Sequence, residues 1–156
     1  MTVSPMRHEE SEEVALLIRN VVQSLDYYNE RAKTEEIGKY QAAELRLLLE
    51  EDPLSVLVAR DQHRIVGFCI SKYDDGLIWL SWFGVDDAAR GQGVGRGLLE
   101  ALGNSLLLRN AHKVWCDTRT DNIRSKSVLE RVGFRKLVEL RNHWYGQDFF
   151  LWEWYP

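Results

Sequence analysis

The sequence predicts an α+β fold in one domain, residues 1–156, with a mixed, twisted, mostly antiparallel sheet of about seven strands and four helices. Three observations predict it. The chain has 156 residues, close to the roughly 150 typical of one domain, and no repeat or Pro/Gly-rich linker divides it. Short β-rich runs follow one another across tight polar turns, which is typical of antiparallel pairs. A helix predicted between two later strands adds one parallel pair.

The N-terminal third of the chain is predicted to be mostly helical. A short first strand is expected over residues 2–7. Apolar residues then recur at helical spacing over residues 11–25, with Ser11 as a candidate N-cap. A second helix is expected over residues 34–51, because Pro53 stops the pattern.

The remainder alternates short strands with two more helices. Asp74-Asp75-Gly76 is a good hairpin turn, and Gly133 is placed to end a helix. The predicted strands are 55–59, 65–70, 77–85, 114–118, 134–140 and 149–155, and the predicted helices are 93–109 and 122–132.

The last predicted strand, residues 149–155, is unusually aromatic, with apolar side chains on both faces. A sheet face of this kind has to be covered. One alternative is a second copy of the chain, which would make a homodimer through this strand. The other is a helix of the same chain. The sequence leaves both open.

Composition and charge exclude several classes of protein. The chain carries 20 basic and 24 acidic residues, a net charge of −4, so no general affinity for nucleic acid is expected. No apolar run approaches the roughly 18 residues of a membrane span, and the polar N-terminus does not resemble a signal peptide. Cys69 and Cys116 lie in apolar runs, as buried thiols do, which favours a reducing, cytoplasmic setting. The histidines are scattered, so no metal site is expected.

The most informative segment is the glycine-rich stretch 85–97, between a predicted strand and a predicted helix. Glycines let the backbone approach a ligand closely, and N–H groups at a helix N-terminus bind phosphate. Arg90 and Arg96 add positive charge. The nucleotide P-loop pattern is absent, and the dinucleotide pattern G-x-G-x-x-G fails because Arg96 and Leu98 stand where glycine is required.

The segment Arg90-Gly91-Gln92-Gly93-Val94-Gly95 fits the acyl-CoA signature [QR]-x-x-G-x-[GA]. Residues 122–134 are similar to the helix pattern N-x-x-[AS]-x-x-x-[YF]-x-x-x-G-F that follows in the same family. With these motifs in this order, the chain resembles the GNAT acyltransferase superfamily of N-acetyltransferases. The resemblance implies a sheet splayed in the middle at an acyl-CoA cleft.

The resemblance also implies a cosubstrate and a set of residues that hold it. Acetyl-CoA would lie with its pyrophosphate on the glycine loop and its pantetheine arm between the parted strands. Asn122 is equally explained as the N-cap of its own helix, and the two roles are compatible. The implied binding residues are Phe83, Gly84, Val85, Arg90, Gly91, Gln92, Gly93, Val94, Gly95, Arg96, Asn122 and Ser125.

The implied reaction is direct acetyl transfer to a primary amine of a small molecule, peptide or protein. Leu129 occupies the position of the family's usual tyrosine proton donor, and it has no proton to give. Tyr145 is a candidate donor, unless it is only a surface aromatic, and Asp117 is a candidate base, unless it is only a solvated residue. A non-catalytic acyl-CoA-binding module of the same fold is the alternative that Leu129 favours.

The acceptor region of the family corresponds to the segment from Asp26 to Glu30 and the helix after it. Tyr27 and Tyr28, with the nearby carboxylates of Glu30, Glu35 and Glu36, would suit a cationic amine. A solvated acidic loop is the other interpretation of this segment.

Overall fold

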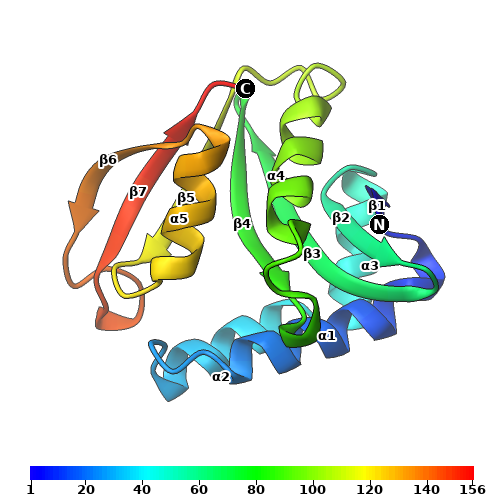
Figure 1. The fold of residues 1–156 in the computed structure, drawn as a ribbon, viewed down its shortest axis with the longest axis horizontal. Coiled ribbons are helices and arrows are strands. Elements are labelled where there is room, and N and C mark those ends of the chain that lie inside the picture. Colours follow the sequence, from blue (N-terminus) through cyan, green and yellow to red (C-terminus); the bar gives the residue numbers. More distant parts are fainter.

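A computed structural model describes residues 1–156 and contains one seven-stranded sheet, in the order β1-β2-β3-β4-β5-β7-β6. Figure 1 shows its two halves separating like the arms of a V, with α1 and α2 across the open end. The strands are β1 (Thr2–Pro5), β2 (Val56–Asp61), β3 (Arg64–Asp74), β4 (Leu77–Val85), β5 (Lys113–Arg119), β6 (Arg135–Leu140) and β7 (Phe149–Trp154).

All neighbouring strands pair antiparallel except β4 and β5, which are parallel and joined through α4. The predicted fold class is therefore confirmed. None of the helices is both long and apolar enough to span a bilayer. The helices are α1 (Ser11–Gln23), α2 (Glu30–Lys39), α3 (Ala42–Glu51), α4 (Val94–Ser105) and α5 (Ile123–Val132).

The helices cover both faces of the sheet, and side-chain alternation along β2 shows the division. Leu57 and Ala59 belong to a core with α4 and α5, whereas Val56 and Val58 belong to a second core with α1 and α3. Because successive strand residues point to opposite faces, the two cores lie on opposite sides of the sheet. Cys69 and Cys116 are free and buried, and burial raises the pKa of the Cys69 thiol to about 12.

The helix predicted over residues 34–51 is two helices, so the structure has five helices rather than four. Tyr40 leaves the helical region at φ −121° and ψ 49°, and Gln41 is extended. The first of the two helices begins four residues earlier than predicted, because Asn29 caps it by accepting a hydrogen bond from the Ala32 N–H. Both helices contact α1, but beyond the break α3 also packs on β2, whereas α2 borders the open end of the sheet.

The aromatic strand β7 lies inside the sheet, between β5 and β6. Trp152 is buried in the core with α4 and α5, and Trp154 packs against Phe134 with ring centroids 5.0 Å apart. A Cβ at Gly103 of α4 would lie 2.5 Å from the Trp154 ring, so only glycine permits this close approach. The chain's own helices therefore cover one face of β7, and a homodimer stays a prediction.

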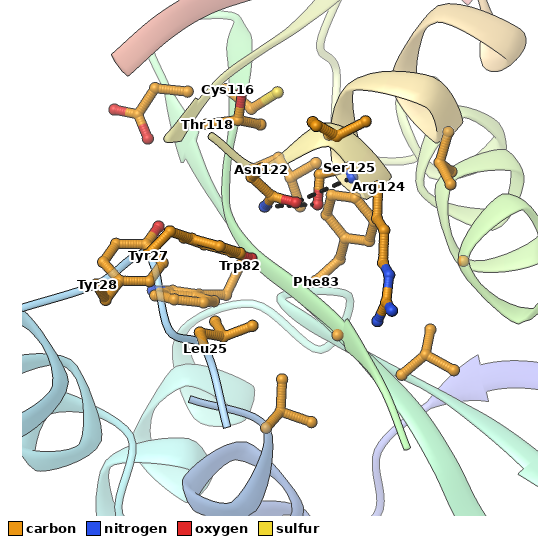
Figure 2. Close-up of a pocket in the computed structure, with 18 of the residues that line it drawn as sticks. Leu25, Tyr27, Tyr28, Trp82, Phe83, Cys116, Thr118, Asn122, Arg124 and Ser125 are labelled. Carbon is orange, nitrogen blue, oxygen red and sulfur yellow. Dashed lines mark hydrogen bonds between the residues drawn. The ribbon is translucent and has the colours of Figure 1, made fainter. Parts of the chain in front are cut away.

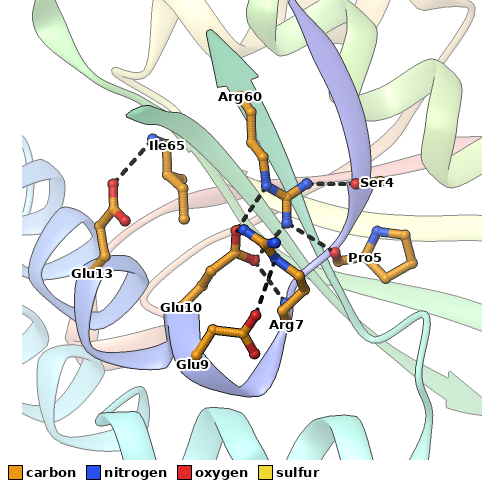
Figure 3. Close-up of polar contacts among 8 residues, drawn as sticks. All are labelled: Ser4, Pro5, Arg7, Glu9, Glu10, Glu13, Arg60 and Ile65. Atoms are coloured by element: carbon orange, nitrogen blue, oxygen red, sulfur yellow. Dashed lines mark hydrogen bonds and ion pairs between the residues drawn. The ribbon is translucent and has the colours of Figure 1, made fainter. Parts of the chain in front are cut away.

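The N-terminus is held to the sheet by a buried carboxylate, Glu10 (Figure 3). Arg60 of β2 donates two hydrogen bonds to it, of 2.8 and 2.5 Å, and Arg7 donates from its backbone and side chain, both at 2.7 Å. Ser11 is not the N-cap predicted for α1; it is the first helical residue, and its hydroxyl accepts a hydrogen bond from Arg46.

Replacing Glu10 with glutamine should destabilise the fold in a pH-dependent way. Burial alone would raise the pKa of Glu10, but the hydrogen bonds from Arg60 and Arg7 outweigh it and lower the pKa to about 2 from a usual 4.5. The carboxylate therefore stabilises the folded state above about pH 4.5, and this contribution is lost as the pH falls toward 2. We expect a loss on the order of 1–3 kcal/mol at pH 7.

The measurement is the free energy of unfolding in denaturant at pH 7 and pH 3. Glu9→Gln is the control, since Glu9 is adjacent but exposed. Equal stability of Glu10→Gln and Glu9→Gln at pH 7 would contradict the role assigned to Glu10.

Candidate active site

The two parallel strands part halfway along their length. Residues Leu77 to Leu80 of β4 pair with Lys113 to Cys116 of β5, and no pairs follow. At this point β4 also carries a bulge, because its pairing with β3 skips Ser81. From Ser81 to Val85, the β5-facing backbone edge of β4 has no strand partner. Such an edge can pair with an extended ligand.

A cleft of about 1430 Å³ opens where the strands part. It reaches from the glycine loop before α4, past the beginning of α5, to the loop between α1 and α2. Figure 2 shows Tyr27, Tyr28 and Trp82 grouped on one side of this cleft, with Asn122 and Ser125 opposite them.

The glycine loop forms one end of the cleft and leaves its backbone N–H groups free. Gly91 and Gly93 have φ values of 76° and 81°, which disfavour other residues, and a Cβ at either would meet nothing within 4 Å. Gly93 caps α4, and no backbone carbonyl accepts a hydrogen bond from the N–H groups between Gly91 and Arg96. Together with the helix dipole, this is an anion-binding arrangement.

The two arginines of the loop are held by ion pairs. Arg90 pairs with Asp87, and Arg96 pairs with Glu100 at 2.7 Å. Both line the cleft, as do eleven of the other residues that the resemblance implied for the cosubstrate or that are candidates for catalysis. Gln92 does not, because its exposed side chain turns back and donates to the Ala88 carbonyl. Those eleven residues are Phe83, Gly84, Val85, Gly91, Gly93, Val94, Gly95, Asn122, Ser125, Asp117 and Tyr145.

Asn122 and Ser125 form the first turn of the helix on the opposite wall. The Asn122 side chain caps α5 by accepting from the Ser125 N–H, and its amide donates to the Ser125 hydroxyl at 2.9 Å. The Ser125 hydroxyl proton therefore remains available toward the cleft. Leu129, one turn further along, is fully buried in the core and does not line the cleft.

Asp117 lies on β5 just beyond the last pair with β4. Its Oδ2 accepts a 2.6 Å hydrogen bond from the indole N–H of Trp144, in the turn between β6 and β7. Burial raises the pKa of Asp117, although the Trp144 hydrogen bond and His143 oppose the shift. A carboxylate in this state is a better proton acceptor than an ordinary surface aspartate.

Two loops meet at the α2 side of the cleft. Asn29, after α1, donates to the backbone carbonyl of Tyr145, and its N–H donates to the Gln147 side chain. The Tyr27 carbonyl accepts from Gln147 and from Arg119 of β5. These hydrogen bonds join the α1–α2 loop to the turn between β6 and β7.

Glu36 of α2 gathers three donors from distant parts of the chain. The Trp82 indole N–H donates to its Oε2 at 2.7 Å, and the Tyr145 hydroxyl and Lys39 ammonium donate to its Oε1 at 2.5 and 2.8 Å. Of this cluster, the sequence pointed to Tyr145 individually and to Glu36 only as one of three nearby carboxylates, and it gave no indication of Trp82 or Lys39. A Glu-Lys pair three apart resembles an ordinary surface ion pair, and no local pattern indicates that Trp82 reaches it. The Tyr145 hydroxyl proton is engaged by Glu36.

Residues 22–134 match the family model described as acetyltransferase (GNAT) family. This is more than half of the chain, so the protein belongs to the GNAT acetyltransferase family. Mycothiol acetyltransferase of Kineococcus radiotolerans is 33% identical over 104 residues, which cover 65% of this chain and 34% of that protein. The match thus spans about a third of that relative's length.

Solved structures of the family share the whole fold at low sequence identity. The ribosomal-protein-alanine N-acetyltransferase of Brucella melitensis superposes with a TM-score of 0.81 at 18% identity, over 100% of both chains. The yncA protein of Salmonella typhimurium, solved with its cofactor acetyl-CoA, superposes with a TM-score of 0.75 at 18% identity, over 99% of this chain and 92% of that one.

Truncating Leu129 should affect stability rather than chemistry. Because Leu129 is fully buried in the core, Leu129→Ala leaves a cavity and should cost about 2–5 kcal/mol, whereas Leu129→Met should cost less than about 1.5 kcal/mol. Denaturant unfolding of both variants measures this. An alanine variant with unchanged stability but altered turnover would place Leu129 in the reaction instead.

Proposed function

We propose that the protein is an acetyl-CoA-dependent N-acetyltransferase that transfers an acetyl group directly to a primary amine. The observation that carries this proposal is the parting of β4 and β5, beyond Leu80 and Cys116, into a cleft. The cleft has free N–H groups at one end and a half-buried carboxylate, Asp117, in its wall. Membership of the family supports it, and so does the structural relative solved with acetyl-CoA.

The residues present fit the cosubstrate. Free N–H groups between Gly91 and Arg96 would hold the pyrophosphate, with the α4 dipole adding to the attraction. The unpaired edge of β4 from Ser81 to Val85 would hydrogen-bond the pantetheine arm, with Asn122 and Ser125 on the facing wall. Acetyl-CoA supplies the acetyl group as a reactive thioester.

The reaction forms a C–N bond as the C–S bond breaks. Asp117 takes a proton from the attacking ammonium, directly or through a water, so that the neutral amine can attack. A backbone N–H of the free β4 edge near Val85 stabilises the developing oxyanion. The departing thiolate is protonated by solvent or by Tyr145, whose hydroxyl would first have to leave Glu36.

The acceptor is a primary amine of a small molecule, peptide or protein, and it enters from the α2 side. Aromatic side chains line this end: Tyr28 lies 5.5 Å from Trp82 and 6.4 Å from Phe149 between ring centroids. Aromatic faces attract cations. The name of the Brucella relative specifies a protein amine, which keeps a protein acceptor among the candidates.

The second candidate function is an acyl-CoA-binding module without turnover. It is favoured by one observation, the burial of Leu129 at the family's usual proton-donor position. Release of free CoA thiol with any amine separates the two, because a module binds acetyl-CoA and releases none.

Acetyl-CoA should raise the melting temperature. At about 100 times its dissociation constant the ligand adds roughly 2.7 kcal/mol, which is on the order of 5–10 °C for a domain of this size. Gly93→Asp should weaken this shift, because it brings a side chain and a negative charge to the pyrophosphate site. The measurement is a thermal melt of both proteins with and without acetyl-CoA. An absent shift in the natural protein would refute the proposed cosubstrate, and an undiminished shift in Gly93→Asp would refute its placement.

Replacing Asp117 with asparagine should remove the acidic limb of the pH–rate profile. Only the ionised carboxylate accepts a proton, so the rate should rise with pH through the raised pKa of Asp117 and level off above it. In Asp117→Asn the rate should fall by roughly 100-fold or more. Tyr145→Phe, measured in parallel, should keep the limb. A limb retained in Asp117→Asn would exclude Asp117 as the base.

A further inference from the structure

Lys39 occupies a preformed cation site in the wall of the cleft. Its ammonium lies 2.8 Å from Glu36 Oε1, 3.2 Å from the Tyr145 hydroxyl oxygen and 5.8 Å from the centre of the Tyr145 ring. Glu36, Tyr145 and Lys39 all line the cleft that we assign to the reaction. A carboxylate, a hydroxyl and an aromatic ring are the groups with which proteins bind an ammonium ion.

The site is held rigid independently of Lys39. Glu36 is 9% exposed, and its second oxygen is fixed by the Trp82 indole. Tyr145 has a left-handed backbone, at φ 56° and ψ 26°, in a turn that Asn29 fastens through the Tyr145 carbonyl. Lys39 itself contributes little to this framework, because more than half of its side chain is exposed to solvent. Its removal would leave the carboxylate buried and short of one partner.

We propose that Lys39 is a specificity-determining residue, whose ammonium fills an ammonium subsite made by Glu36 and Tyr145 and so excludes acceptors that carry a second cationic group. The inference rests on the proposed acetyl transfer and deepens it. A diamine or a lysine-rich peptide that presents one amine for transfer finds its second charge repelled by Lys39. A monoamine meets no such repulsion at this subsite.

The charge of Lys39 is firmly maintained. Burial alone would lower the pKa of Lys39, but the hydrogen bonds to Glu36 and Tyr145 raise it, so the lysine stays protonated through the neutral range. A second positive charge on the acceptor is therefore repelled from this subsite throughout the neutral pH range. If Lys39 becomes neutral and apolar, the same carboxylate attracts the second charge of the acceptor.

The test compares terminal diamines of propane, butane and pentane with the corresponding monoamines. In Lys39→Met the ratio of kcat/KM for diamine over monoamine should rise about tenfold or more, for at least one chain length. Lys39→Arg keeps a cation in the subsite and should retain the natural ratio. The double variant Lys39→Met with Glu36→Gln lacks the carboxylate and should lose the gain. An unchanged ratio in both Lys39→Met and Lys39→Ala would overturn the proposal.

A binding readout separates this inference from the proposed function. The same diamines should raise the melting temperature of Lys39→Met, but not that of the natural protein or of the double variant, whether or not any amine is acetylated. If no amine is turned over but this pattern of melting shifts is found, the subsite stands and the proposed transfer fails. If monoamines are turned over and no diamine stabilises Lys39→Met, the transfer stands and the subsite fails.

Discussion

The site depends on the place where β4 and β5 stop pairing. Four residues of β4 pair with four residues of β5. Beyond these pairs, β4 continues to pair only with β3, and β5 continues to pair only with β7. Because a backbone group needs a partner, the unpaired edge of β4 is stable only next to water or a ligand. The bulge at Ser81 lies at the branch point and adds local twist. An opening at this position is thus built into the hydrogen-bond pattern.

A sheet split in this way needs a connection across its open end, and two loops supply it. The Tyr27 carbonyl accepts hydrogen bonds from Arg119, in one half of the sheet, and from Gln147, in the turn before β7. Helix α1, which precedes Tyr27, packs on the other half of the sheet. The cluster around Glu36 connects the same parts through side chains. These contacts fix the spacing between the halves, so the width of the cleft and the position of its polar groups are determined together.

Helices and strands with a strong local pattern were predictable from the sequence. Contacts between residues far apart in the chain were not. The strand Leu77–Val85 was predicted with its observed bounds, since a hairpin turn precedes it and the glycine loop follows it. The break at Tyr40 was missed because no proline or cap residue marks it. Both helices contact α1, but α3 also packs on β2 and α2 on the turn between β6 and β7, and such long-range packing leaves no local pattern. Likewise, Glu36 and Tyr145 are over a hundred positions apart, and no sequence pattern around either residue indicates that the two are hydrogen-bonded.

The two buried cysteines make thiol reactivity a measure of whether the protein is folded. Disulfide reagents attack thiolates, and both thiols are buried, with the pKa of Cys69 raised to about 12 and the pKa of Cys116 raised as well. The folded chain should therefore not react with such reagents, so in an assay of the proposed acetyl transfer they would report only CoA thiol released by turnover. Opening the core would expose Cys69 and Cys116, and their labelling would time the global unfolding of the sheet.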